Sequence, residues 1–398
     1  MGAHALLAPS SAKRWMTCHP SARLEATMPE KETVFTREGT IAHAMAEKIL
    51  RFYLLEAFAR LEEGATFLTC CAEVISDEIK ACEAEGLDWR EMAETVHDYY
   101  CRPVFESYLG AKLQDPEAEL LIEAKLKLSE FIPEGFGSSD AVLIYKDTME
   151  VFDLKYGKGV KVSAENNAQM MCYALGAYCG PGEFYDINTV RMTIIQPRLR
   201  HESSIEICVV DLLFWAEQVL KPAAQAAYRG VGEQIPGDHC RFCKVAAQCK
   251  ALAAHTLNIT GQTQDPGLMS LDEIAHLLPH FATIKSWISA VEEHALNQAL
   301  EGQKVPGFKV VEGRSIRRLS SADEAVQRLR NAGFEDEDFY KPRELKTLTD
   351  LEKTLTKKGF TTLLGDIVIK PEGKPTLVEE SDPRQPFSKA NNDFKELL

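Results

Sequence analysis

An aspartate and a lysine lie two residues apart in the segment MEVFDLK, whose apolar and polar residues alternate as in a strand. Side chains at i and i+2 of a strand leave the same face, so we expect Asp153 and Lys155 side by side. A carboxylate there can hold a divalent cation, and the ammonium group can orient or help deprotonate an attacking water. Taken alone, D-x-K is more often a solvated ion pair at a strand end.

A second aspartate supports the hydrolytic interpretation. Asp140 follows the small residues GSS, which allow a ligand to approach closely, and it begins the predicted strand DAVLIYKD. Two neighbouring strands would bring Asp140 and Asp153 together as oxygen ligands of the kind that Mg²⁺ and Mn²⁺ prefer. Glu123, in ELLIEAKLKL, is a further candidate acid on the preceding strand.

Two pairs of residues four apart have the spacing of a shared helix face. His43 and Glu47 form one pair upstream of the aspartates, and Gln169 and Tyr173 form the other downstream. A neutral imidazole is a plausible metal ligand or ligand-orienting group. Each pair alone is more often a packed or solvated face, and only the ordered set favours a site.

The elements that must position these residues predict an α/β fold. The chain is expected to be helical to about residue 61, and helical again from about 66 to 109 with a break at Pro103. A helix over about 164–178 and another over about 212–228 are expected to flank the sheet. Strands are predicted at 119–128, 140–147, 149–155, 189–197 and 204–211.

Composition shifts divide the chain into two predicted domains. Residues 1–260 are expected to form the mixed α/β core, with a helical insertion at about 60–115 and a cysteine cluster at the end. Residues 261–398 predict a smaller, helix-rich α+β accessory region with a hairpin around 307–319. The chain contains no internal repeat and no Walker A pattern, which argues against an ATP-driven motor.

Charge and hydropathy limit the classes of protein. The 398 residues are 45% hydrophobic and carry a net charge of −15, which argues against indiscriminate coating of DNA. A local basic strip remains compatible with this charge, because Lys158 and Lys161 alternate with glycines after the Asp153 strand. No apolar run is long enough to cross a membrane and no signal peptide is evident, so we expect a cytoplasmic protein.

The eleven cysteines are expected to be reduced in that compartment. Four scattered ones, Cys82, Cys101, Cys172 and Cys208, are expected to be small buried apolar residues. The run HCRFCKVAAQC instead places three thiols at metal-ligand spacing and leaves a tetrahedral site one ligand short. Cys18 is the natural fourth ligand, and the run contributes Cys240, Cys243 and Cys249.

The ordered motifs GTIAH (39–43), GSSD (137–140), DLK (153–155) and QMMCY (169–173) resemble the RecB-like branch of PD-(D/E)XK nucleases. The resemblance covers about residues 4–250 and implies a restriction-endonuclease-like core. In that family the histidine and the acids bind the divalent ion, the lysine is catalytic, and the Q-x-x-x-Y helix contacts DNA. Carried over, these roles fall on His43, Asp140, Asp153, Lys155, Gln169 and Tyr173.

The split cysteine set resembles that of AddB-type nucleases and related CRISPR-adaptation nucleases. In those proteins one early and three late cysteines hold a [4Fe–4S] cluster, and the resemblance implies the same structural cluster here. Tetrahedral Zn²⁺ is the alternative, with His239 or His19 as substitute ligands, and idle thiols are a further one.

The resemblance implies a Mg²⁺- or Mn²⁺-dependent deoxyribonuclease, with exonuclease action as the expected mode. The ends of the chain also resemble phage and prophage proteins, which implies DNA recombination beside a single-strand annealing partner. A rival interpretation is a non-catalytic DNA-binding or assembly protein that keeps the fold and the metal. A zinc-stapled structural protein without DNA affinity is a third. A homo-oligomer is compatible with the sequence.

Overall fold

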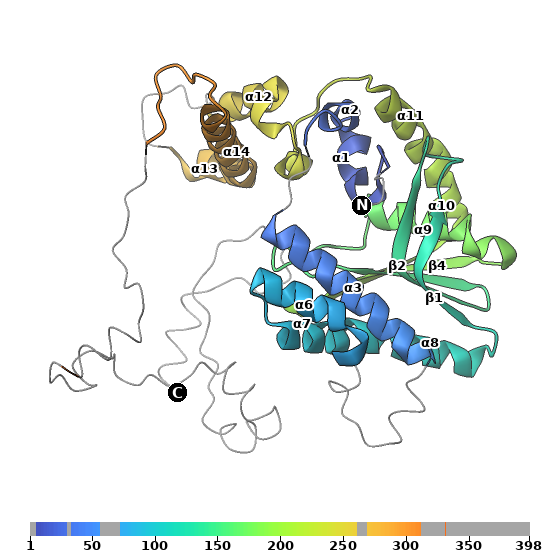
Figure 1. Cartoon of the computed structure of the whole chain (residues 1–398). Coiled ribbons are helices and arrows are strands. Elements are labelled where there is room, and N and C mark those ends of the chain that lie inside the picture. Colours follow the sequence, from blue (N-terminus) through green and yellow to red (C-terminus); the bar gives the residue numbers. More distant parts are fainter. Residues whose placement is uncertain (1–4, 30–32, 56–71, 261–268, 312–330, 332–398) are drawn as a thin grey trace, which may run out of the picture. The chain divides into compact units, whose positions relative to one another are not determined.

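Figure 1 shows the protein as a computed structural model, which describes residues 5–29, 33–55, 72–260, 269–311 and 331. The chain divides into two units after Val311, and all of the second unit except residue 331 lies outside the described residues. The hairpin predicted around 307–319 continues beyond residue 311 and so lies largely outside the described residues. The part of it that is described, 307–311, contains no strand.

One five-stranded mixed sheet forms the centre of the first unit, and it confirms the predicted α/β class. The strands follow chain order across the sheet. Every neighbouring pair is antiparallel except β3 and β4, which run parallel and therefore need a crossover between them. The strands are β1 (Glu119–Lys127), β2 (Phe136–Tyr145), β3 (Thr148–Leu154), β4 (Thr189–Gln196) and β5 (His201–Cys208).

Helices cover both faces of this sheet and bury a separate apolar core on each (Figure 1). The first face is covered by α1 (Ala12–Thr17), α2 (Ser21–Glu25), α9 (Ala168–Tyr178), α10 (Val209–Trp215) and α11 (Lys221–Arg229). The second face is covered by α3 (Val34–Leu55), α6 (Ser76–Glu85), α7 (Trp89–Val96) and α8 (Arg102–Gln114).

Short helical turns and a C-terminal group of helices complete the first unit. Two π-helical turns are η2 (His97–Cys101) and η5 (Ala216–Leu220), and 3₁₀ turns include η6 (Asp238–Phe242) and η7 (Ala246–Gln248). The last described helices are α12 (Lys250–Thr260), α13 (Leu271–Leu277) and α14 (Phe281–Leu300). No described helix is long and apolar enough to cross a membrane.

Strand β1 contributes apolar side chains to both cores, although these side chains all come from even-numbered positions. Leu120 and Ile122 pack under α3, whereas Ala124 and Leu126 pack under α9. Uniform alternation would send all four side chains to one face. Glu123 lies between the two pairs with a left-handed φ of 51°, and this local distortion changes which core the strand faces.

Helix α9 lies unusually close to the sheet because of Gly176. A Cβ on this residue would come within 2.8 Å of Leu126 Cβ on β1 and 3.1 Å of Leu128 Cγ. Only glycine allows this approach without displacing the strand. The close packing fixes the first turns of α9, which carry Gln169 and Tyr173, beside the sheet.

Four details of the predicted elements were wrong. The strand predicted at 204–211 is instead β5, from His201 to Cys208, and Val209 already begins α10. Strand β2 begins at Phe136, four residues before the predicted start, so the GSSD motif is part of the strand. Pro103 occupies the first turn of α8, where its missing N–H costs nothing, and it follows a π-helical turn instead of breaking the helix. Cys208 is exposed at the end of β5, where it was expected to be buried.

Candidate functional site

Asp140 and Asp153 lie opposite each other on neighbouring strands. The last paired residues of β2 and β3 are Ala141 and Phe152, so the next position of the same register joins the two aspartates. Like charges directly opposite each other destabilise a sheet. This row of carboxylates therefore requires positive charge nearby.

Lys155 supplies part of that charge to Asp153. The Lys155 Nζ lies 2.9 Å from Asp153 Oδ1 and 2.7 Å from Oδ2, and the aspartate is 2% exposed. Lys155 is one residue past the end of β3, where its backbone N–H donates to Ile195 O at 2.9 Å. The predicted same-face arrangement of Asp153 and Lys155 is present.

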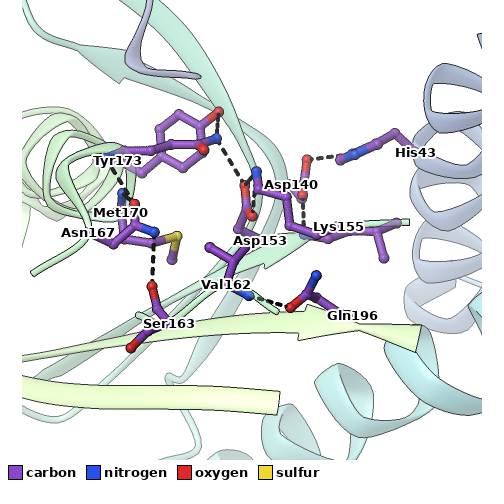
Figure 2. A network of polar contacts seen from close by, with 12 residues as sticks. His43, Asp140, Asp153, Lys155, Val162, Ser163, Asn167, Met170, Tyr173 and Gln196 are labelled. Atoms are coloured by element: carbon purple, nitrogen blue, oxygen red, sulfur yellow. Dashed lines mark hydrogen bonds and ion pairs between the residues drawn. The ribbon is translucent and has the colours of Figure 1, made fainter. Parts of the chain in front are cut away.

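Asp140 is held by a histidine of helix α3, which covers the second face of the sheet. His43 Nδ1 lies 3.0 Å from Asp140 Oδ1, and the backbone N–H of Leu154 donates to Asp140 Oδ2 at 2.7 Å. Figure 2 shows Asp140, Asp153 and Lys155 between His43 on one side and Tyr173 on the other. Residues distant in the sequence therefore converge on one end of the β2–β3 pair.

The two carboxylates have different acidities. Burial alone would raise the pKa of Asp140, but His43, the Leu154 N–H and Lys155 together lower it. Burial raises the pKa of Asp153 above its ordinary value, because Lys155 only partly offsets the burial and the Asp140 charge. Burial would lower the pKa of His43, yet the charge and hydrogen bond of Asp140, with Asp153, raise it.

Gln169 and Tyr173 complete the contacts of Asp153. Gln169 Nε2 donates to Asp153 Oδ1 at 3.2 Å and to the Tyr173 hydroxyl at 2.9 Å. Asn167 caps α9 by accepting the backbone N–H groups of Gln169 and Met170 (Figure 2). The cap and the close packing of α9 thus fix the Gln169 amide against the buried carboxylate.

Glu123 adds a third carboxylate to the same row. The β1–β2 register that pairs Ile122 with Ala141 and Ala124 with Ser139 sets Glu123 opposite Asp140. Burial raises its pKa, a Ser138 hydrogen bond lowers it, and the charges of Asp140 and Glu47 raise it. Glu123 and Glu47 therefore belong to the electrostatic surroundings of the site.

The lysines of the loop after β3 are exposed, as a phosphate-binding strip requires. Lys158 and Lys161 are both exposed on this loop. Buried Gln196, at the end of β4, holds the loop by accepting Val162 N–H at 2.7 Å and donating to Val160 O at 3.1 Å (Figure 2). The loop is thus anchored at its centre while its lysines face solvent.

The donor set of this site suits a divalent cation. Two aspartates and an imidazole are ligands that Mg²⁺ and Mn²⁺ accept, and in this site the aspartates contact His43 and Lys155. In the part of the chain that the structure describes, no three Cys, His, Asp or Glu side chains already converge as metal ligands.

The four predicted cluster cysteines line one cavity. Cys18 follows α1, Cys240 lies in η6, and Cys243 and Cys249 directly follow η6 and η7. Burial raises the pKa of Cys240 and raises that of Cys243 to about 12. The structure thus brings together a residue from the start of the chain and three from the end of the α/β core.

Backbone N–H groups already point at two of these sulfurs. Gly237 N–H donates to Cys240 Sγ at 3.4 Å, and Leu252 N–H donates to Cys249 Sγ at 3.4 Å. Such hydrogen bonds stabilise thiolates bound to metal. His239 Nε2–H instead donates to Ile235 O at 2.9 Å, so this nitrogen is already engaged by the backbone. The donor chemistry therefore fits a four-thiolate site.

A buried carboxylate ties the N-terminal helices to the cysteine run. Glu25, at the end of α2, accepts Arg14 Nε at 2.7 Å and the backbone N–H of Lys244 at 2.8 Å. Both contacts are shielded, since the Arg14 and Glu25 side chains are mostly buried. Glu25 thereby joins α1, α2 and the turn after Cys243.

Comparison with known proteins identifies the family. The model of a family described as protein of unknown function (DUF2800) matches residues 4–385, nearly the whole chain. The chain belongs to the DUF2800 family. A solved structure titled "Crystal structure of SSO0001" covers 60% of this DUF2800 protein and 96% of its own chain, at 10% identity. Its TM-score is 0.22, which is too low to support a conclusion.

Residues that the sequence did not single out also shape the site of this DUF2800 protein. Gln196 is buried in a strand end, and a polar residue among apolar ones was the only signal for it. Tyr100 is fully buried on the π-helical turn η2, and its hydroxyl has no hydrogen-bond partner among the described residues. Burial raises its pKa, as do the charges of Asp140 and Asp153.

Proposed function

We propose that this protein is a Mg²⁺- or Mn²⁺-dependent deoxyribonuclease of the RecB-like PD-(D/E)XK type. The observation that carries the proposal is the convergence of Asp140 and Asp153 with Lys155, His43 and Gln169. The same residues form the ordered motifs that resemble that family. Five residues from α3, β2, β3 and α9 with matching chemistry are stronger support than any single motif.

Each residue has a defined part in this proposal. Asp140, Asp153 and His43 would hold the divalent cation, which when bound stabilises negative charge on the scissile phosphate and activates water. Lys155, beside Asp153, orients the attacking water and helps to remove its proton. Gln169 and Tyr173 position the carboxylate and face the DNA, and Lys158 and Lys161 neutralise its phosphates.

The test is cleavage of linear DNA with Mn²⁺ or Mg²⁺ by the wild-type chain and by Asp153→Asn and Asp153→Ala. Both variants are expected to lose metal-dependent cleavage while circular dichroism shows an unchanged fold. Lys155→Met is expected to lower the rate by about 10²–10⁴-fold, the usual contribution of a proton-transfer group. Asp147→Asn, on the exposed turn between β2 and β3, is the matched control and should keep full activity.

Full cleavage by Asp153→Asn would contradict the proposal. A wild-type chain that binds DNA but never cuts it would instead favour the non-catalytic DNA-binding interpretation. Circular and linear substrates compared side by side test the exonuclease mode, because an exonuclease leaves covalently closed DNA intact. Activity in phage recombination, beside a single-strand annealing protein in the host cytoplasm, is the setting that the resemblance favours.

We further propose that the four cysteines hold a structural [4Fe–4S] cluster. The support is their common cavity and the two N–H···S contacts, together with the resemblance of the split spacing to AddB-type nucleases. Anaerobically purified protein is expected to be brown and to contain iron and sulfide, and Cys18→Ser should lose both. One zinc per chain without iron would replace the cluster by tetrahedral Zn²⁺.

A further inference from the structure

Two stretches of this acidic chain contain no Asp or Glu. The chain has 60 acidic residues among 398, yet residues 1–24 and 239–264 have none. Helix α1 in the first stretch contacts η6 in the second, beside the cysteine cavity. The fold therefore brings the described parts of the two acid-free stretches together, at a place where α14 also contacts η6 and η7.

Exposed cations gather in this region. Lys13 comes from α1, and Arg241, Lys244 and Lys250 come from the cysteine run and the start of α12; all four are exposed. The charges of Lys13 and Arg14 act on His239, which lies two residues before Arg241. Cations of the first stretch are therefore close to the second stretch. Exposed acids also border this run: Asp238 directly precedes it, and α14, which contacts η6 and η7, carries Glu292 and Glu293. Buried Glu25 is compensated by Arg14.

A large aromatic side chain is exposed next to Arg241. Phe242 is 74% exposed, and Arg241 Cζ lies 5.5 Å from the centroid of its ring. The two residues form the middle of the C-x2-C turn, which closes through Cys243 N–H donating to Cys240 O at 3.0 Å. The turn and the cysteines on either side hold the ring at the surface.

We propose that this region, including Phe242, binds single-stranded DNA. An unpaired base stacks on the Phe242 ring, and Arg241 and Lys13 neutralise the adjacent phosphates. Duplex DNA keeps its bases stacked on one another, so it offers phosphates but no free base face. The inference rests on the proposed nuclease function and defines its substrate as a strand that is unpaired near the cysteine turn.

The test uses full-length protein carrying Asp153→Asn, which prevents cutting, and fluorescence anisotropy with labelled dT20 and a 20-base-pair duplex. Adding Phe242→Ala is expected to weaken dT20 binding by about five- to a hundredfold, because base–aromatic stacking is lost. Phe242→Trp should retain dT20 binding. Lys13→Ala should lower the salt slope for dT20 by about 0.7.

Phe184→Ala is the matched control, since Phe184 is 87% exposed but follows an acidic residue, Glu183. It should leave dT20 binding unchanged, and Phe242→Ala should leave duplex binding unchanged. Equal dT20 affinity with and without Phe242, or no dT20 binding by the parent protein, would overturn the inference. Cleavage by the wild-type chain is measured separately, so dT20 binding without any cleavage overturns only the nuclease proposal.

Discussion

At the scale of single residues, the two aspartates of the site differ although they share one row of the sheet. Asp140 accepts His43 and a backbone N–H, which lower its pKa, whereas Asp153 is more deeply buried and its pKa is raised. Cation binding needs both carboxylates ionised. If the proposed cation binds here, we therefore expect the ionisation of Asp153 to set the acidic limit of its binding.

Gln169 gives a direct test of that limit. Gln169→Glu would place a second carboxylate 3.2 Å from Asp153 Oδ1 in place of a donor, which raises the pKa of Asp153 further. The acidic limb of the cleavage-rate profile should therefore move to higher pH, by about one unit or more. Gln169→Ala, which removes the donor without adding charge, should shift it less; equal shifts would contradict this account.

At the scale of elements, β1 contains a strained position beside the site. Glu123 adopts a left-handed φ in the middle of the strand, a conformation that costs a non-glycine residue about 1 kcal/mol or more. The same position lets β1 contribute to both cores and places a carboxylate opposite Asp140. The strain is thus linked to the geometry of the site.

Comparing glycine and alanine at residue 123 isolates this strain, because both substitutions remove the side chain. Glu123→Gly should be more stable than Glu123→Ala by about 1 kcal/mol, since glycine adopts a positive φ without steric cost. Urea denaturation measures the difference. At Lys125, an exposed position of the same strand, the order should be reversed, because glycine ordinarily weakens a strand. The same order at both positions would show that Glu123 is unstrained.

Local patterns predicted the elements well, and long-range contacts less well. The alternation in 189–197 and 149–155 located β4 and β3 to within a residue or two, because these strands bury regular apolar faces. The same alternation predicted that Asp153 and Lys155 lie side by side on one face. The roles of Gln196 and Tyr100 depend on tertiary packing, and the distortion at Glu123 interrupts an alternation that the sequence itself continues.

At the scale of the whole molecule, Glu25 connects the two ends of the α/β core. Its contact with Lys244 N–H spans 219 residues, and its ion pair with Arg14 is largely buried. The three groups lie beside the cysteine cavity. We therefore expect this contact to govern both stability and the retention of metal by the cysteines.

Glu25→Ala should lower the free energy of unfolding by about 2–4 kcal/mol, because Arg14 and the Lys244 N–H lose their acceptor in a shielded place. It should also speed the loss of iron or zinc to a chelator. Glu38→Ala is the matched control, because Glu38 forms a similarly shielded ion pair with Arg198 away from the cysteines. Thermal unfolding and metal analysis separate the effects; equal metal loss in both variants would contradict the assigned role.

The distance along the chain between Glu25 and Lys244 also sets an order of events during protein synthesis. Cys18 and helices α1 and α2 leave the ribosome first, and their partners follow 219 residues later. At ordinary elongation rates that interval lasts roughly 10 to 45 s. All four cysteines can enclose the proposed cluster only after it, so we expect insertion of that cluster to come late in the biogenesis of this domain.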